Sequence, residues 1–169
     1  GALGTRIQKY NLSEEDFRGA RFMEKPGQMK GNNDLLCLTA PHVIQDIHRK
    51  YLEVGADIIE TNTFNAQRIS MADYHVEECC REINLAAAKL ARELADEYTR
   101  KNPNKPRFVA GSVGPTNKTC SMSPDVNNPA FRALTFDDLA DAYQEQMEAL
   151  LEGGVDAIAL ENFSDWPLA

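Results

Sequence analysis

The sequence lacks the long apolar and basic stretches that membrane insertion and nucleic-acid binding require. No segment approaches the roughly 18–20 consecutive apolar residues of a membrane span, and the N-terminal end has no signal-peptide pattern. Acidic residues number 26 against 18 Lys and Arg, which gives a formal net charge of −8. We therefore expect no nucleic-acid partner and no membrane partner, and a protein that acts on a small molecule.

Cysteine is also scarce, with four residues in a chain of 169. This density is too low for a small disulfide scaffold, so we expect free thiols and a cytoplasmic location. The Gly-x-Gly-x-x-Gly fingerprint is absent after every apolar run, which argues against a dinucleotide-binding site.

The chain has enough apolar material for a core, because 43% of its residues are hydrophobic. It starts at Gly1 without a Met and finishes at Ala169, a few residues after an apolar run. We expect both ends to be cuts and residues 1–169 to be one partial domain.

Short apolar runs alternate with longer amphipathic stretches. The apolar runs are typical of parallel strands buried on both faces, and the amphipathic stretches carry helix-start and helix-stop signals. We predict strands at 56–62, 107–112 and 155–161 and helices at 41–54, 65–98 (broken, or two in succession) and 135–152. Segments 11–34 and 117–132 lack periodicity and are predicted to be long loops.

Strands that alternate with helices predict a parallel sheet, either doubly wound or closed into a (β/α)8 barrel. Polar residues follow each predicted strand, among them Glu60, Ser112 and Glu161. Both architectures bind ligands at this edge of the sheet. A glutamate there could bind a substrate ammonium or could hold a neighbouring loop amide, and the pattern favours neither.

Adjacent Cys79 and Cys80 invite a zinc hypothesis, but no third Cys or His is near them in the sequence. We interpret both as structural thiols. His42 and His48 are six residues apart and do not share a helix face, so we expect surface or helix-capping roles. His75 has no candidate partner in the sequence.

A set of motifs is spread along the chain, at 1–5, 30–36, 55–64, 71–74, 109–111, 114–119, 123–126 and 128–132. These motifs resemble those of one family, the homocysteine-binding domain of cobalamin-dependent methionine synthases. Related enzymes that use betaine or S-methylmethionine are expected to share the barrel but not the long loops 114–119 and 123–126. The similarity extends over residues 1–161, while the tail 162–169 departs from the family pattern.

The resemblance implies a (β/α)8 TIM-type barrel, of which this chain supplies the first helix through the fourth strand. It implies that the backbone amides of Gly1 and Ala2 bind the carboxylate of homocysteine and that Glu161 binds its amino group. Asn62 and Thr63 are expected to line the pocket.

The resemblance also implies zinc and cobalamin. The family's zinc ligands are one Cys after strand six and a Cys-Cys pair after strand eight, all beyond Ala169, and other modules bind cobalamin and methyltetrahydrofolate. Zinc would hold the homocysteine sulfur as a thiolate that attacks the methyl group on cobalamin.

This chain alone is then expected to be inactive, with no catalytic residue and no metal ligand of its own. Two alternatives stay open, namely a homocysteine methyltransferase that uses betaine or S-methylmethionine, and a non-catalytic half-barrel that binds or assembles with a partner. Half a barrel would expose strand edges and apolar helix faces, so we expect poor solubility or oligomers.

Overall fold

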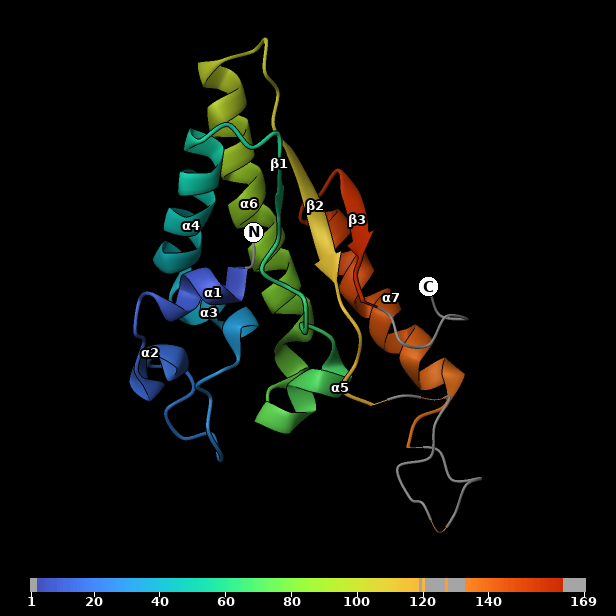
Figure 1. Ribbon diagram of the computed structural model, residues 1–169. Helices are drawn as coiled ribbons and strands as arrows, with labels where there is room; N and C mark the ends of the chain where they lie inside the picture. The colour runs from blue at the N-terminus through green and yellow to red at the C-terminus, as the bar shows by residue number, and fades with distance from the viewer. Residues whose placement is uncertain (1–2, 119, 121–126, 128–132, 163–169) are drawn as a thin grey trace.

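The computed structural model describes residues 3–118, 120, 127 and 133–162 (Figure 1). Gly1, Ala2, most of the predicted loop 117–132 and residues 163–169 of the tail lie outside the described residues. None of the helices in the described part has the length and apolar content that crossing a membrane requires.

Three parallel strands form the sheet, in the order β1-β2-β3. They are β1 (Ile58–Glu60), β2 (Phe108–Val113) and β3 (Ala157–Leu160). Ala110 lies opposite Glu60 on one side and opposite Ala157 on the other, so all three strands finish at the same edge of the sheet. This confirms the predicted strands and the α/β class with a parallel sheet.

A long helix precedes each strand, as the amphipathic pattern predicted. These helices are α4 (Pro41–Glu53), α6 (Cys80–Lys101) and α7 (Phe136–Glu152). Pro41 occupies the first turn of α4, where its missing N–H costs no hydrogen bond. Thr135 caps α7 through a reciprocal capping box with Asp138.

Shorter helical segments complete the described chain, and two of them correct the prediction that 11–34 is a loop. Ser13 accepts a hydrogen bond from the backbone of Asp16 and starts a five-residue helix, which is too short to show periodicity in the sequence. The short segments are α1 (Leu3–Gln8), α2 (Glu14–Arg18), η1 (Asn33–Leu35), α3 (Leu36–Thr39), α5 (Arg68–Met71), η2 (Ala72–Tyr74) and η3 (Glu77–Cys79).

The two faces of the sheet differ. Ile59, Val109 and Val113 are buried on the face that the helices cover. On the other face Ile58 is 60% exposed and Phe108 is 45% exposed. The prediction of strands buried on both faces was therefore wrong, because no element of the described chain packs on the second face.

Candidate functional site

A cavity of about 750 Å³ lies over the open face of the sheet and the carboxyl ends of its strands. Its walls come from β1, β2 and the residue after β3, from the segment 61–65, and from α4. The remaining lining residues are Leu3, Gly4, Asn33 and Asp34. Glu161, Asn62 and Thr63, three of the residues expected to bind ligand, all line it. Gly1 and Ala2, the other two residues expected to bind ligand, lie outside the described residues.

Glu161 follows β3 directly and is half-buried. Its backbone N–H donates to the Val113 carbonyl at 2.9 Å, which extends the sheet ladder by one residue. The hydroxyl of Ser112 on β2 donates to Glu161 Oε1. Two neighbouring strands thus fix the orientation of this carboxylate, and no described residue forms a hydrogen bond or ion pair with its second oxygen.

A threonine network forms the cavity floor between β1 and β2. Thr61 Oγ1 and Thr63 Oγ1 are 2.6 Å apart, and Thr63 Oγ1 donates to the Ser112 carbonyl at 2.7 Å. The Ser112 N–H donates to Thr61 Oγ1 at 3.0 Å. Both threonines are buried, so their hydroxyls hold the strand ends together.

Asn62 connects this floor to η1. Its Nδ2 donates to the Asn33 carbonyl at 2.7 Å. Its backbone carbonyl accepts from the Cys37 thiol, with 3.6 Å between Sγ and the oxygen. Burial raises the pKa of that thiol to about 12, with a further contribution from nearby Asp34. Cys37 is therefore a protonated thiol inside the wall of the site.

Asp34 is a buried carboxyl group that the sequence reasoning did not single out. It lines the cavity, and its Oδ1 accepts from the Asn65 N–H at 3.3 Å. Burial raises the pKa of Asp34 from its ordinary 3.8 to about 7, although the hydrogen bonds from Asn65 and from its own backbone lower it. The only signal in the sequence was an aspartate directly before the apolar pair Leu35-Leu36.

His48 differs from the prediction of a surface or capping histidine. It is 1% exposed on α4, lines the cavity, and its Nε2 has no hydrogen-bond partner among the described residues. Burial lowers its pKa to about 4, so the imidazole is neutral at pH 7. His48 lies four residues after the buried Ile44, so it belongs to the apolar stripe of α4 that packs toward the sheet.

The described residues do not fit a zinc ion. No group of three or more His, Cys, Asp or Glu side chains in the described part of the chain is arranged to hold a metal. Cys79 and Cys80 are buried free thiols whose pKa values are raised, mainly by burial, that of Cys80 to about 12. Both side chains lie in the hydrophobic core, and their structural role stays a prediction.

Residues 1–167 match the family model described as homocysteine S-methyltransferase. The chain belongs to this family. Its fold also matches the homocysteine methyltransferase MmuM from Escherichia coli. The metallated form of MmuM gives a TM-score of 0.67 at 21% identity, covering 95% of this chain and 51% of that one. The apo form gives 0.57 at 21% identity, covering 94% and 46%.

This homocysteine S-methyltransferase family chain therefore spans about half the length of the solved structures that it matches. At 21% identity the likeness shows the fold alone. The shared part is a three-stranded parallel sheet with its preceding helices, and the cavity lies at the strand ends, where α/β folds bind their ligands.

Proposed function

We propose that this chain is the homocysteine-binding part of a methyltransferase that methylates the thiol of homocysteine to give methionine. The observation that carries the proposal is the carboxylate of Glu161, which Ser112 orients at the strand ends of the cavity. A fixed carboxylate binds an ammonium group with little further loss of side-chain entropy. Membership of the homocysteine S-methyltransferase family supports the same substrate.

In the proposed complex each residue of the site has one task. Glu161 binds the α-ammonium group, and the backbone amides of Gly1 and Ala2 bind the α-carboxylate. Asn62 and Thr63 are buried and donate their hydrogen bonds within the protein, so they shape the wall that the substrate lies against.

The proposed parent enzyme is a cobalamin-dependent methionine synthase in the cytoplasm, with a closed (β/α)8 barrel. Its loop motifs at 114–119 and 123–126 support this member of the family. Zinc would favour the reactive thiolate form of homocysteine, and cobalamin would supply the methyl group. Methyltetrahydrofolate would replenish that methyl group. The described residues do not fit the zinc, so none of the tasks above depends on either group.

Calorimetric titration of the whole chain with L-homocysteine tests the binding role. We expect Glu161→Gln to weaken binding at least about tenfold, because it removes the charge that pairs with the ammonium group. Glu60→Gln is the matched control, since Glu60 lines the same cavity from the neighbouring strand end, and it should change the affinity less than about twofold. Equal losses in both variants, or no binding to the unchanged chain, would contradict the proposal.

The methyl donor is tested with these residues in a polypeptide of full family length. Methionine formed from homocysteine and methylcobalamin supports the cobalamin enzyme. Methionine formed only with betaine or S-methylmethionine contradicts it, while leaving the homocysteine site intact.

A further inference from the structure

Asp34 is a buried carboxyl group that has no task in the proposed complex. It lines the substrate cavity and is 3% exposed, and elements of the described chain alone bury it. No Lys, Arg or His among the described residues forms an ion pair with it. Because an uncompensated charge is costly to bury, such a group is favoured in its protonated, neutral form.

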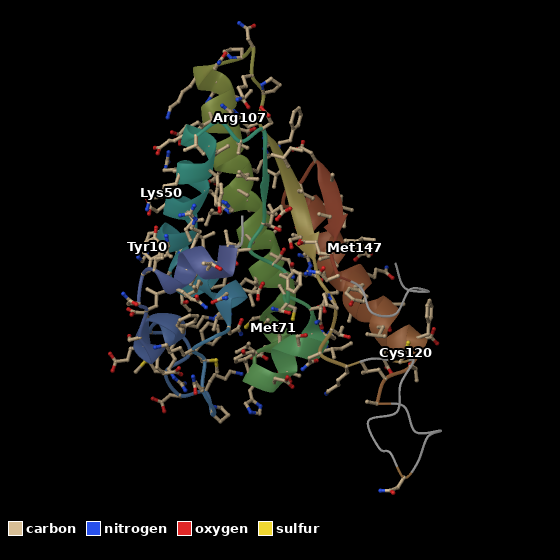
Figure 2. The ribbon with its side chains drawn as sticks, in the orientation of Figure 1. Tyr10, Lys50, Met71, Arg107, Cys120 and Met147 are labelled. Carbon is tan, nitrogen blue, oxygen red and sulfur yellow. The ribbon has the colours of Figure 1, made fainter. Side chains whose placement is uncertain are left out.

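Three contacts hold the segment around Asp34 in place. The Asn65 N–H donates to Asp34 Oδ1 at 3.3 Å, and Asn62 Nδ2 donates to a backbone carbonyl of η1 at 2.7 Å. Asn32 Nδ2 donates to Met71 Sδ at 3.4 Å, and Figure 2 shows Met71 at the end of the molecule where the strands finish. Segment 32–34 is therefore joined both to the chain after β1 and to α5, which fixes Asp34 in the cavity wall.

Asp34 and Glu161 lie on opposite sides of the cavity. Asp34 bonds the segment after β1, whereas Glu161 follows β3 and pairs with β2, the central strand. Figure 1 shows α3, which follows η1 directly, on the β1 side of the sheet. Gly4 is on this side too, because a β-carbon there would be 3.5 Å from Asn33 Nδ2. An amino acid whose ammonium group binds Glu161 would direct its carboxylate away from that anion, toward Asp34.

Three groups that titrate around Asp34 are neutral near pH 7. Burial raises the pKa of Cys37 on α3 to about 12, with a contribution from Asp34. Burial also raises the pKa of Tyr74 on η2, with contributions from Asp34 and Asp73. His48 on α4 lines the same cavity, and burial lowers its pKa to about 4. Asp34, whose pKa burial raises to about 7, is the member of this set that changes charge in the neutral range.

The remaining titratable groups near this part of the site are acidic. Glu60 and Glu161 line the cavity from the strand ends. Asp73 lies on η2, outside the cavity lining, and accepts a hydrogen bond from Asn117 Nδ2. No Lys or Arg of the described chain lines the cavity. An ionised Asp34 would therefore add negative charge beside an incoming carboxylate, with no described cation to offset it.

We propose that Asp34 must be protonated for the cavity to bind the α-carboxylate of homocysteine. This inference rests on the proposed function, in which the amino acid lies between Glu161 and the amides of Gly1 and Ala2. The hydroxyl of protonated Asp34 is a hydrogen-bond donor for a carboxylate oxygen, whereas ionised Asp34 repels it. The site then binds its ligand together with a proton on Asp34.

Calorimetric titration of the whole chain with L-homocysteine between pH 6 and pH 8 tests the inference. The apparent Kd varies inversely with the fraction of molecules that can bind. With a pKa of about 7 for Asp34, the protonated fraction falls about tenfold over this range. The Kd of the unchanged chain, divided by that of Asp34→Asn, should therefore rise about tenfold. The ratio cancels the titration of the ligand, and the amide of the variant is neutral at every pH.

The same titrations at pH 7, in two buffers of different ionisation enthalpy, measure the protons taken up on binding. The unchanged chain should take up about 0.5 proton more than Asp34→Asn, because a group at its pKa is half ionised. Asp73→Asn is the matched control, since it removes one charge from outside the cavity lining. It should keep both the pH profile and the proton uptake of the unchanged chain.

Each other outcome contradicts the inference in a distinguishable way. Equal pH profiles for the unchanged chain and Asp34→Asn would overturn it while leaving homocysteine binding intact. A Kd ratio that falls as the pH rises would place the ammonium group of the ligand beside Asp34, and would overturn it as well. A loss of the pH profile in Asp73→Asn would assign the effect to charge outside the cavity. An absence of binding at every pH would overturn the proposed function and this inference together.

Discussion

At the residue scale, the buried carboxyl group of Asp34 gives the site a pH dependence. Protonated Asp34 is favoured in the fold, because its pKa is raised from 3.8 to about 7 by burial. The folded state then binds the proton more tightly than the unfolded state. The resulting stability is complete below pH 3.8 and is lost as the pH rises through about 7.

We therefore expect Asp34→Asn, which keeps an acceptor for the Asn65 N–H, to gain stability relative to the unchanged chain as the pH rises from 4 to 8. The full difference is on the order of 4 kcal/mol. Urea unfolding of both proteins across this range measures it. Comparing the two proteins cancels the opposite contribution of His48, whose pKa is lowered to about 4. A difference that does not vary with pH would show that Asp34 is ionised throughout.

Sequence reasoning was uneven at this scale. It placed Glu161 directly after a strand because this glutamate follows an apolar run in the sequence. It missed Asp34 and misjudged His48, because the burial of a polar side chain depends on which distant element covers it. The roles expected for Gly1, Ala2, Asn62, Thr63 and Glu161 in binding substrate stay predictions.

At the element scale, the capping box of α7 should contribute measurably to stability. Thr135 Oγ1 accepts from the Asp138 N–H at 3.1 Å, and Asp138 accepts from the Thr135 N–H at 2.9 Å. Thr135→Ala removes the first of these bonds and should lower the free energy of unfolding by about 1 kcal/mol. Thr135→Ser keeps the hydroxyl, so urea unfolding should detect a smaller loss. Equal losses in the two variants would assign the effect to the methyl group instead.

The long helices were predictable because amphipathic periodicity over a dozen or more residues outweighs local noise. The strands were predictable because each is a short apolar run that follows one of these helices. Short segments were not. The five residues of α2 depend on Ser13 and on the contacts of Arg18, which bonds Glu14 and the carbonyl of Phe22. Such contacts join neighbouring turns without leaving a repeat in the sequence.

At the scale of the whole molecule, the chain should not bind zinc tightly by itself. Every His and Cys in the sequence lies among the described residues, and they form no metal cluster with each other or with described carboxylates. Elemental analysis after dialysis should find well under one zinc per chain. The double variant Cys79→Ser with Cys80→Ser should give the same content. Tight 1:1 zinc that disappears in this variant would contradict the structural role of these thiols.

The parallel α/β architecture followed from the order of elements, whereas the open face of the sheet did not. Near-continuous apolar runs predicted strands that are buried on both faces, but Ile58 and Phe108 are exposed. The sequence shows that these positions are apolar. It does not show whether another element packs on them.

The hydrogen bonds at the strand ends link the order of the site to the opening of the sheet. The Thr61 N–H donates to the Ala110 carbonyl, and the Glu161 N–H donates to the Val113 carbonyl. The Ser112 N–H donates to the Thr61 hydroxyl. Each of these amides is held across strands and not within one local turn. They should therefore exchange with deuterium only when neighbouring strands separate, at rates set by the same opening that unfolds the sheet. Any substitution that loosens the sheet interior would then lower the fraction of molecules with an ordered site, even if it lies far from the cavity.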